Sequence, residues 1–167
     1  MTIKERQLVI KEFSKEILEA TRIMESLGYK EHNIELVLEE VIKNNLKKLN
    51  DYLTMEYEKG NYIVCGGDFN HDIANSIDKF DTTQEIPSWV YELKESDLCD
   101  NFSFATSSNA PTCRSTDLPY TKGINYSVVV DGFIVSNNVE VIEITNIDND
   151  FLYSDHNPVY LDFSLNQ

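Results

Sequence analysis

The sequence has few basic residues and no long apolar run. Its 167 residues include 14 Lys and Arg against 29 Asp and Glu, a formal net charge of -15 at pH 7. Such a surface is unfavourable for gripping a nucleic-acid backbone without added cations, because phosphate contacts depend on Lys and Arg. No stretch approaches the roughly 18 to 20 consecutive apolar residues of a membrane-spanning helix, so we expect a soluble protein.

Cysteine is also scarce, and no CxxC pair occurs. Cys65, Cys99 and Cys113 are odd in number and widely spaced, which favours reduced thiols over a disulfide framework or a zinc site. The first residues, "MTIKERQLVI", lack the apolar core of a signal peptide. A cytoplasmic location is therefore the default expectation.

Proline is absent before Gly60, and only Gly28 interrupts that segment. Apolar residues recur at helical spacing on both sides of Gly28, which predicts two amphipathic helices. Gly28 is placed to end the first helix, and Asn33 is placed to cap the second. Residues 1–59 are therefore predicted to form a helical hairpin. Structural cover with a solvated acidic face is the simpler interpretation, and a partner-binding helix pair is the alternative.

After Gly60 the segments shorten and become strand-like. Five candidate strands are separated by turn-forming Asn, Asp, Gly and Pro residues. They lie at residues 61–67, 103–108, 126–136, 139–147 and 158–165. Residues 86–94 form a candidate short helix that begins after Pro87. We expect the five strands to form one mixed sheet, with the helix over residues 43–58 packed on one face.

Polar clusters stand at the ends of three predicted strands. Asp68 and Asn70 in "GGDFN" are two residues apart, so extended geometry would project both side chains from one face. Asp131 in "DGFIVS" has apolar neighbours, and an unpaired carboxylate is costly to desolvate there. Asp155 and His156 in "SDHNPV" directly precede the last strand. Taken singly, each cluster has a simpler explanation as a turn or a strand edge.

Together, in this order and strand context, the three motifs resemble the endonuclease/exonuclease/phosphatase family, the DNase I-like metal-dependent phosphoesterases. The resemblance covers residues 43–167 and implies an α+β fold. This fold would be the C-terminal half of a four-layer αββα sandwich, a mixed β-sheet with helices on one face. Residues 1–42 would form a helical lead-in.

The resemblance also implies roles for the motif residues. Asp68 would orient or deprotonate the attacking water, and Asn70 would hydrogen-bond the phosphoryl group. Asp131 would hold the ring of His156, which would meet the phosphate as a cationic imidazole or, as an alternative role, act as the base. Asp155 would lie with Asp68 on the metal side, and the metal would be Mg²⁺ or Mn²⁺. Candidate phosphate contacts, each also explained as an ordinary loop residue, are His71, Arg114 and Lys122.

The chain departs from the family by lacking a recognisable first half. That half supplies an early Asn, a metal-binding Glu and a catalytic His or Tyr, whereas Glu35, Glu39 and Glu40 lie in a helical pattern. We therefore expect a fragment or a truncated gene product. Its second sheet would expose an apolar face to a missing N-terminal half, a homodimer partner or the helical hairpin.

Two functions stay open from the sequence. The first is a metal-dependent phosphoesterase that hydrolyses a phosphodiester or phosphomonoester. The second is a non-catalytic remnant that binds a partner through its helices. The missing metal-binding Glu separates them, because the first function needs it from another segment. The substrates that stay open are nucleic acid, nucleotide, phosphoinositide and sphingolipid.

Overall fold

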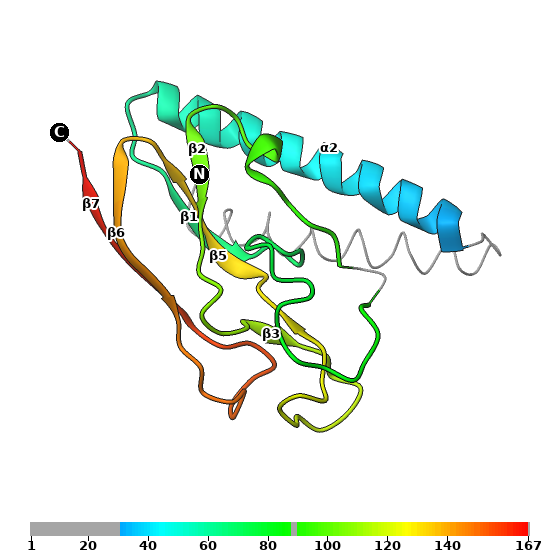
Figure 1. Cartoon of the computed structure of the whole chain (residues 1–167). Coiled ribbons are helices and arrows are strands. Elements are labelled where there is room, and N and C mark those ends of the chain that lie inside the picture. The colour runs from blue at the N-terminus through cyan, green and yellow to red at the C-terminus, as the bar shows by residue number, and fades with distance from the viewer. Residues whose placement is uncertain (1–30, 88–89, 167) are drawn as a thin grey trace. The chain divides into compact units, whose positions relative to one another are not determined.

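The computed structural model describes residues 31–87 and 90–166. Contacts divide the chain into two units, Met1–Tyr52 and Leu53–Gln167. Helix α2 (Glu31–Glu58) runs through the division and is labelled in Figure 1. The second predicted helix is thus confirmed, but it already includes His32, so the prediction that Asn33 caps its start is wrong. The first helix and the Gly28 cap lie outside the described residues, and the predicted boundary after residue 42 stays a prediction.

Seven strands occur in the described part of the chain, so the α+β class is confirmed. They are β1 (Val64–Asp68), β2 (Phe102–Ala105), β3 (Cys113–Arg114), β4 (Ser127–Val128), β5 (Asp131–Ser136), β6 (Val139–Asn146) and β7 (Val159–Leu165). They form three small sheets, β1-β5-β2, β3-β4 and β6-β7, in which every pairing is antiparallel. All five predicted segments contain strands, but the prediction that they form one mixed sheet is wrong.

The predicted strand over residues 126–136 is split because its middle bonds to loops. The Val129 carbonyl accepts the Ile73 N–H, and the Val130 carbonyl accepts the Phe69 N–H. The helix predicted over residues 86–94 is also wrong in its described part, since residues 90–94 are not helical. Backbone bonds instead join Tyr91 and Leu93 to Asp72. A short 3₁₀ helix follows at Glu95–Asp97.

Strand β5 is the centre of the second unit, and Figure 1 shows it between β1 and β2. Ile134 is fully buried on it, and Val135 packs with Ala105 and Val139 in one apolar cluster. The last turn of α2 adds Tyr57, whose ring meets Phe102 edge-on at 5.9 Å. These contacts stabilise the β1-β5-β2 sheet. The polar motifs lie at one end of this sheet.

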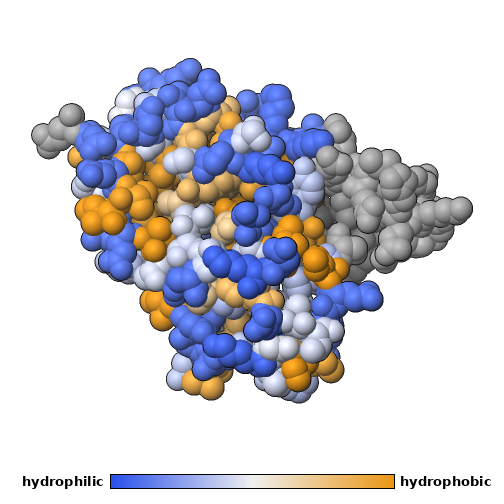
Figure 2. Space-filling view, viewed as in Figure 1, coloured by the Kyte–Doolittle hydropathy of each residue, from blue (hydrophilic) through white to orange (hydrophobic). Residues whose placement is uncertain are grey.

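Large apolar side chains are exposed on the β6–β7 sheet, whereas the apolar face predicted for the second sheet of a sandwich stays a prediction. They are Ile142, Tyr160, Phe163 and Leu165, each at least 40% exposed. Figure 2 shows exposed apolar groups set among hydrophilic ones on the face in view. Alternation along β7 places Phe163 and Leu165 on one face of this small sheet and Tyr160 on the other, so exposed apolar groups lie on both of its faces.

Two glycines face each other beside the polar motifs, and they tolerate a methyl group unequally. A Cβ on Gly132 would lie 2.7 Å from Ile73 Cδ1 and 3.1 Å from the Ala105 carbonyl oxygen, whereas one on its cross-strand partner Gly67 would meet nothing within 4 Å. We expect Gly132→Ala to lower the free energy of unfolding by about 1–3 kcal/mol. Gly67→Ala is the matched control and should change it by less than about 0.5 kcal/mol. Equal urea midpoints for the two variants would contradict the prediction.

Candidate functional site

Two carboxylates meet at one end of the central sheet. Asp68 is the last residue of β1 and Asp131 is the first residue of β5, and the antiparallel register places them directly opposite each other. The Asp68 side chain is 38% exposed and the Asp131 side chain is 19% exposed. Two adjacent carboxylates repel each other unless a positive charge lies close to both.

His156 brings that charge. Its Nδ1 lies 2.7 Å from Asp131 Oδ2, and its Nε2 lies 4.0 Å from Asp68 Oδ2. The predicted hydrogen-bond contact between Asp131 and His156 is therefore confirmed. A protonated imidazole donates from both ring nitrogens, so it can hold Asp131 with one and face Asp68 with the other.

The pKa values of this cluster are shifted by contact and burial. The hydrogen bond to Asp131, followed by the neighbouring Cys113 thiol, raises the pKa of His156 to about 11, so the ring is cationic at neutral pH. Burial is the main cause that raises the pKa of Asp68, and it outweighs the hydrogen bond from the Asn70 backbone N–H. A carboxylate with a raised pKa is a better proton acceptor than an ordinary one.

A short strip of chain holds His156 in place. His156 forms an isolated antiparallel bridge with Cys113 in β3. The Arg114 N–H donates to the Asp155 carbonyl at 3.1 Å, and the Asn157 N–H donates to the Thr112 carbonyl at 2.8 Å. The sequence did not predict β3, because a two-residue strand has no periodicity to recognise.

Asn70 departs from the predicted geometry. Strand β1 ends at Asp68, and Asn70 has a φ of 55°, in the left-handed region. The argument that extended geometry projects both side chains from one face is therefore wrong. The Asn70 backbone N–H donates to Asp68 Oδ1 at 2.7 Å. A depression of about 360 Å³ beside the cluster is lined by Asp68, Asp131 and Asn157, but neither Asn70 nor His156 is among its lining residues.

The three candidate phosphate contacts do not line this depression. The His71 side chain is 5% exposed and meets Tyr91 edge-on at 6.1 Å between ring centroids, so it does not face solvent as a phosphate contact would. Arg114 is half-buried; its Nη1 donates to the Ser115 carbonyl, and its guanidinium lies 5.7 Å from the Tyr120 ring centroid.

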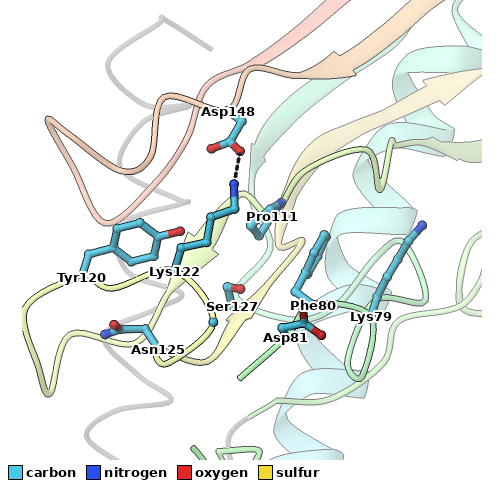
Figure 3. Close-up of a pocket in the computed structure, with 10 residues that line it drawn as sticks. Lys79, Phe80, Asp81, Pro111, Tyr120, Lys122, Asn125, Ser127 and Asp148 are labelled. Atoms are coloured by element: carbon cyan, nitrogen blue, oxygen red, sulfur yellow. Dashed lines mark hydrogen bonds and ion pairs between the residues drawn. The ribbon is translucent and has the colours of Figure 1, made fainter. Parts of the chain in front are cut away.

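Lys122 lies at a second cavity, of about 400 Å³. Figure 3 shows it beside Tyr120 on one side of this cavity, with Phe80 on the other side. Its Nζ is 3.2 Å from Asp148 Oδ2 and 3.8 Å from Asp150 Oδ1. Two carboxylates offset the charge of this lysine, which weakens its case as a phosphate contact.

The predicted metal ligands give only part of a metal site. Among the described side chains, no group of three or more His, Cys, Asp or Glu residues is placed to hold a metal ion. Asp155 is close enough to Asp68 to raise the pKa of that carboxyl. Mg²⁺ prefers carboxylate and water oxygens in an octahedral shell, and two carboxylates supply a minority of it. The described residues therefore do not form a complete metal centre.

Comparison with known proteins adds no relative: no protein-family model, curated protein or solved structure matches this chain. Within the described residues, no helix is both long enough and apolar enough to cross a membrane. A functional assignment therefore rests on the cluster of Asp68, Asp131 and His156.

Proposed function

We propose that this chain is the C-terminal part of a metal-dependent phosphoesterase of the endonuclease/exonuclease/phosphatase type. Its fold would be half of a DNase I-like four-layer sandwich. The observation that carries the proposal is the position of His156, 2.7 Å from Asp131 and 4.0 Å from Asp68. These residues come from three separate strand-end motifs, in the order that the resemblance requires.

The cluster suits the charge changes of phosphate-ester hydrolysis. The reaction needs a positioned water, neutralised phosphoryl oxygens and a stabilised leaving oxygen. The cationic His156 can donate its Nε2–H to a phosphoryl oxygen bound beside Asp68, while Asp131 keeps the opposite nitrogen protonated. Asp68, with its raised pKa, can orient the attacking water and accept its proton. Asn70 would approach the phosphoryl group only after its side chain is turned toward the depression.

A divalent cation, Mg²⁺ or Mn²⁺, would supply further charge neutralisation when bound. Asp68 and Asp155 would contribute to its site, and the remaining ligands would come from water and from a segment outside the described residues. We propose that this segment belongs to an N-terminal half or to a second copy of the chain. Such a partner would also cover the exposed apolar side chains of β6 and β7. Nucleic acid is one candidate substrate among phosphate esters.

A non-catalytic binding module is the second candidate function. The observation that favours it is the incomplete set of metal ligands among the described side chains. The exposed apolar side chains of β6 and β7 suit a partner in either case. Catalysis therefore has to be tested with and without a companion half.

We expect the chain alone to hydrolyse bis-p-nitrophenyl phosphate poorly, even with millimolar-scale Mg²⁺ or Mn²⁺, because the metal lacks its principal protein carboxylate. Adding the N-terminal half of an enzyme of this type, by fusion or as a separate chain, should raise turnover by about 10- to 100-fold. Release of p-nitrophenolate measures both.

Strong metal-dependent hydrolysis by the chain alone would contradict that expectation. If His156→Ala and Asp68→Asn abolished it, then a helical residue such as Glu39 or a second copy of the chain would supply the missing ligand. Turnover that stays absent after the companion half has bound would favour the non-catalytic binding module.

A further inference from the structure

Thr112 is fully buried immediately before β3, and its side chain accepts two backbone hydrogen bonds. Its Oγ1 receives the Val130 N–H at 2.9 Å and the Asp131 N–H at 3.0 Å. The second donor belongs to the residue whose carboxylate holds His156. One hydroxyl oxygen therefore fixes the backbone at the start of β5.

The backbone of Thr112 is also hydrogen-bonded to the segments that carry Asp131 and His156. Its N–H donates to the Val128 carbonyl at 3.1 Å, on the segment that leads to Asp131. Its carbonyl accepts the Asn157 N–H at 2.8 Å, directly after His156. Thr112 is thus hydrogen-bonded to the segment that carries Asp131 and to the segment that carries His156.

The local break in the strand explains why a hydroxyl is needed here. Between β4 and β5, the Val129 N–H donates to Ser76 Oγ and the Val130 N–H donates to Thr112 Oγ1. Side-chain oxygens therefore replace the ladder partners that a continuous strand would use. A buried N–H that loses its acceptor keeps its full desolvation cost, so removal of Oγ1 should shift the backbone at Asp131.

We propose that Thr112 is a positioning residue: its hydroxyl sets the geometry of the Asp131–His156 hydrogen bond. Its catalytic consequence rests on the proposed phosphoesterase function, whereas the geometry can be measured on the chain itself. Thr112→Val keeps the shape of the side chain and removes the acceptor. Thr112→Ser keeps the acceptor and removes only a methyl group.

The test follows the imidazole proton between Asp131 and His156. In the full chain labelled with ¹⁵N-histidine, a proton on Nδ1 that is held by a carboxylate gives a low-field ¹H resonance and exchanges slowly with water. Asp131→Asn identifies this resonance by removing it. We expect Thr112→Val to abolish it or to speed its exchange by at least about 10-fold, and we expect Thr112→Ser to retain it, because the backbone donors still have an acceptor.

Ser136→Ala is the matched control, at the opposite end of β5. Ser136 is also fully buried, and its Oγ accepts the Ile63 N–H at 2.9 Å. Its loss should lower the urea midpoint as Thr112→Val does, but leave the imidazole proton unchanged. If Thr112→Val does not fold, Thr112→Cys takes its place, since a thiol is a weaker acceptor, and an intermediate exchange rate is then expected.

Three results would overturn the proposal: an unchanged resonance in Thr112→Val or its Cys substitute, an equal loss in Ser136→Ala, or a loss in Thr112→Ser as large as in Thr112→Val.

In the enzyme restored by a companion half, Thr112→Val should also lower kcat by about 10-fold with little change in KM. If the imidazole proton depends on Thr112 but His156→Ala leaves turnover intact, then the positioning role stands and the proposed phosphoesterase function fails.

Discussion

Replacing His156 by alanine is expected to lower phosphodiester turnover by about 10²- to 10⁴-fold in the enzyme restored by a companion half. The substitution removes the cation that faces Asp68. Asp68→Asn should have a comparable effect, because an amide keeps the shape of the side chain but accepts a proton poorly. Both groups act on the transition state, so kcat should fall while KM changes little. Steady-state hydrolysis of bis-p-nitrophenyl phosphate measures both constants.

The double variant sharpens this expectation. If His156 and Asp68 act as one unit, then the combined substitution should cost little more than the larger single loss, since effects within one catalytic unit are not additive. Asp150→Asn is the matched control, because Asp150 is an exposed carboxylate paired with Lys122 at 3.8 Å. It should change kcat by less than about 2-fold. Full additivity, or a loss in the control as large as in Asp68→Asn, would contradict the proposed roles.

The individual strands could be predicted from the sequence, but the sheets could not. Apolar runs between turn residues mark each strand locally. The division between β4 and β5 depends on Ser76 Oγ and Thr112 Oγ1, which are 53 and 18 residues away from their backbone donors along the chain. The failed helix over residues 86–94 has the same cause, because Leu93 bonds to Asp72 rather than within its own turn. Local patterns carry no information about such distant acceptors.

The cluster of two carboxylates and an imidazole was predicted from the resemblance of its three motifs, in their order, to a known family rather than from local patterns. The antiparallel register of β1 and β5 places Asp68 opposite Asp131. The backbone conformation after Asp68 was less predictable. Asn70 adopts the left-handed conformation, which Asn tolerates but does not require. Asp72, fully buried, accepts the Ala74, Ser76 and Ile77 N–H groups. These hydrogen bonds to the Asp72 carboxylate hold the loop that follows His71. No local sequence pattern indicates that His71 is buried.

The protein is expected to lose stability as pH rises from about 6.5 toward about 11. The hydrogen bond to Asp131 raises the pKa of His156 from 6.5 to about 11. A group with a raised folded-state pKa stabilises the fold fully below its unfolded-state pKa, and that contribution is lost as pH rises through the folded-state pKa. We expect a loss of about 2 kcal/mol in the free energy of unfolding, the size of a hydrogen bond between charged groups.

Urea titrations at pH 6, 8 and 10 measure this loss, with His156→Gln as the reference. Burial raises the pKa of Tyr126 to about 12, and this tyrosine is present in both proteins. Its contribution therefore cancels in the difference between wild type and variant. Burial also raises the pKa of Asp68, so the ionisation of this carboxyl opposes folding. We expect wild type to exceed His156→Gln in stability at pH 6, and this difference to narrow at pH 8 and again at pH 10 as the pH approaches the folded-state pKa of His156. Parallel curves over that range would show that His156 is not held as a cation by Asp131 in the folded state.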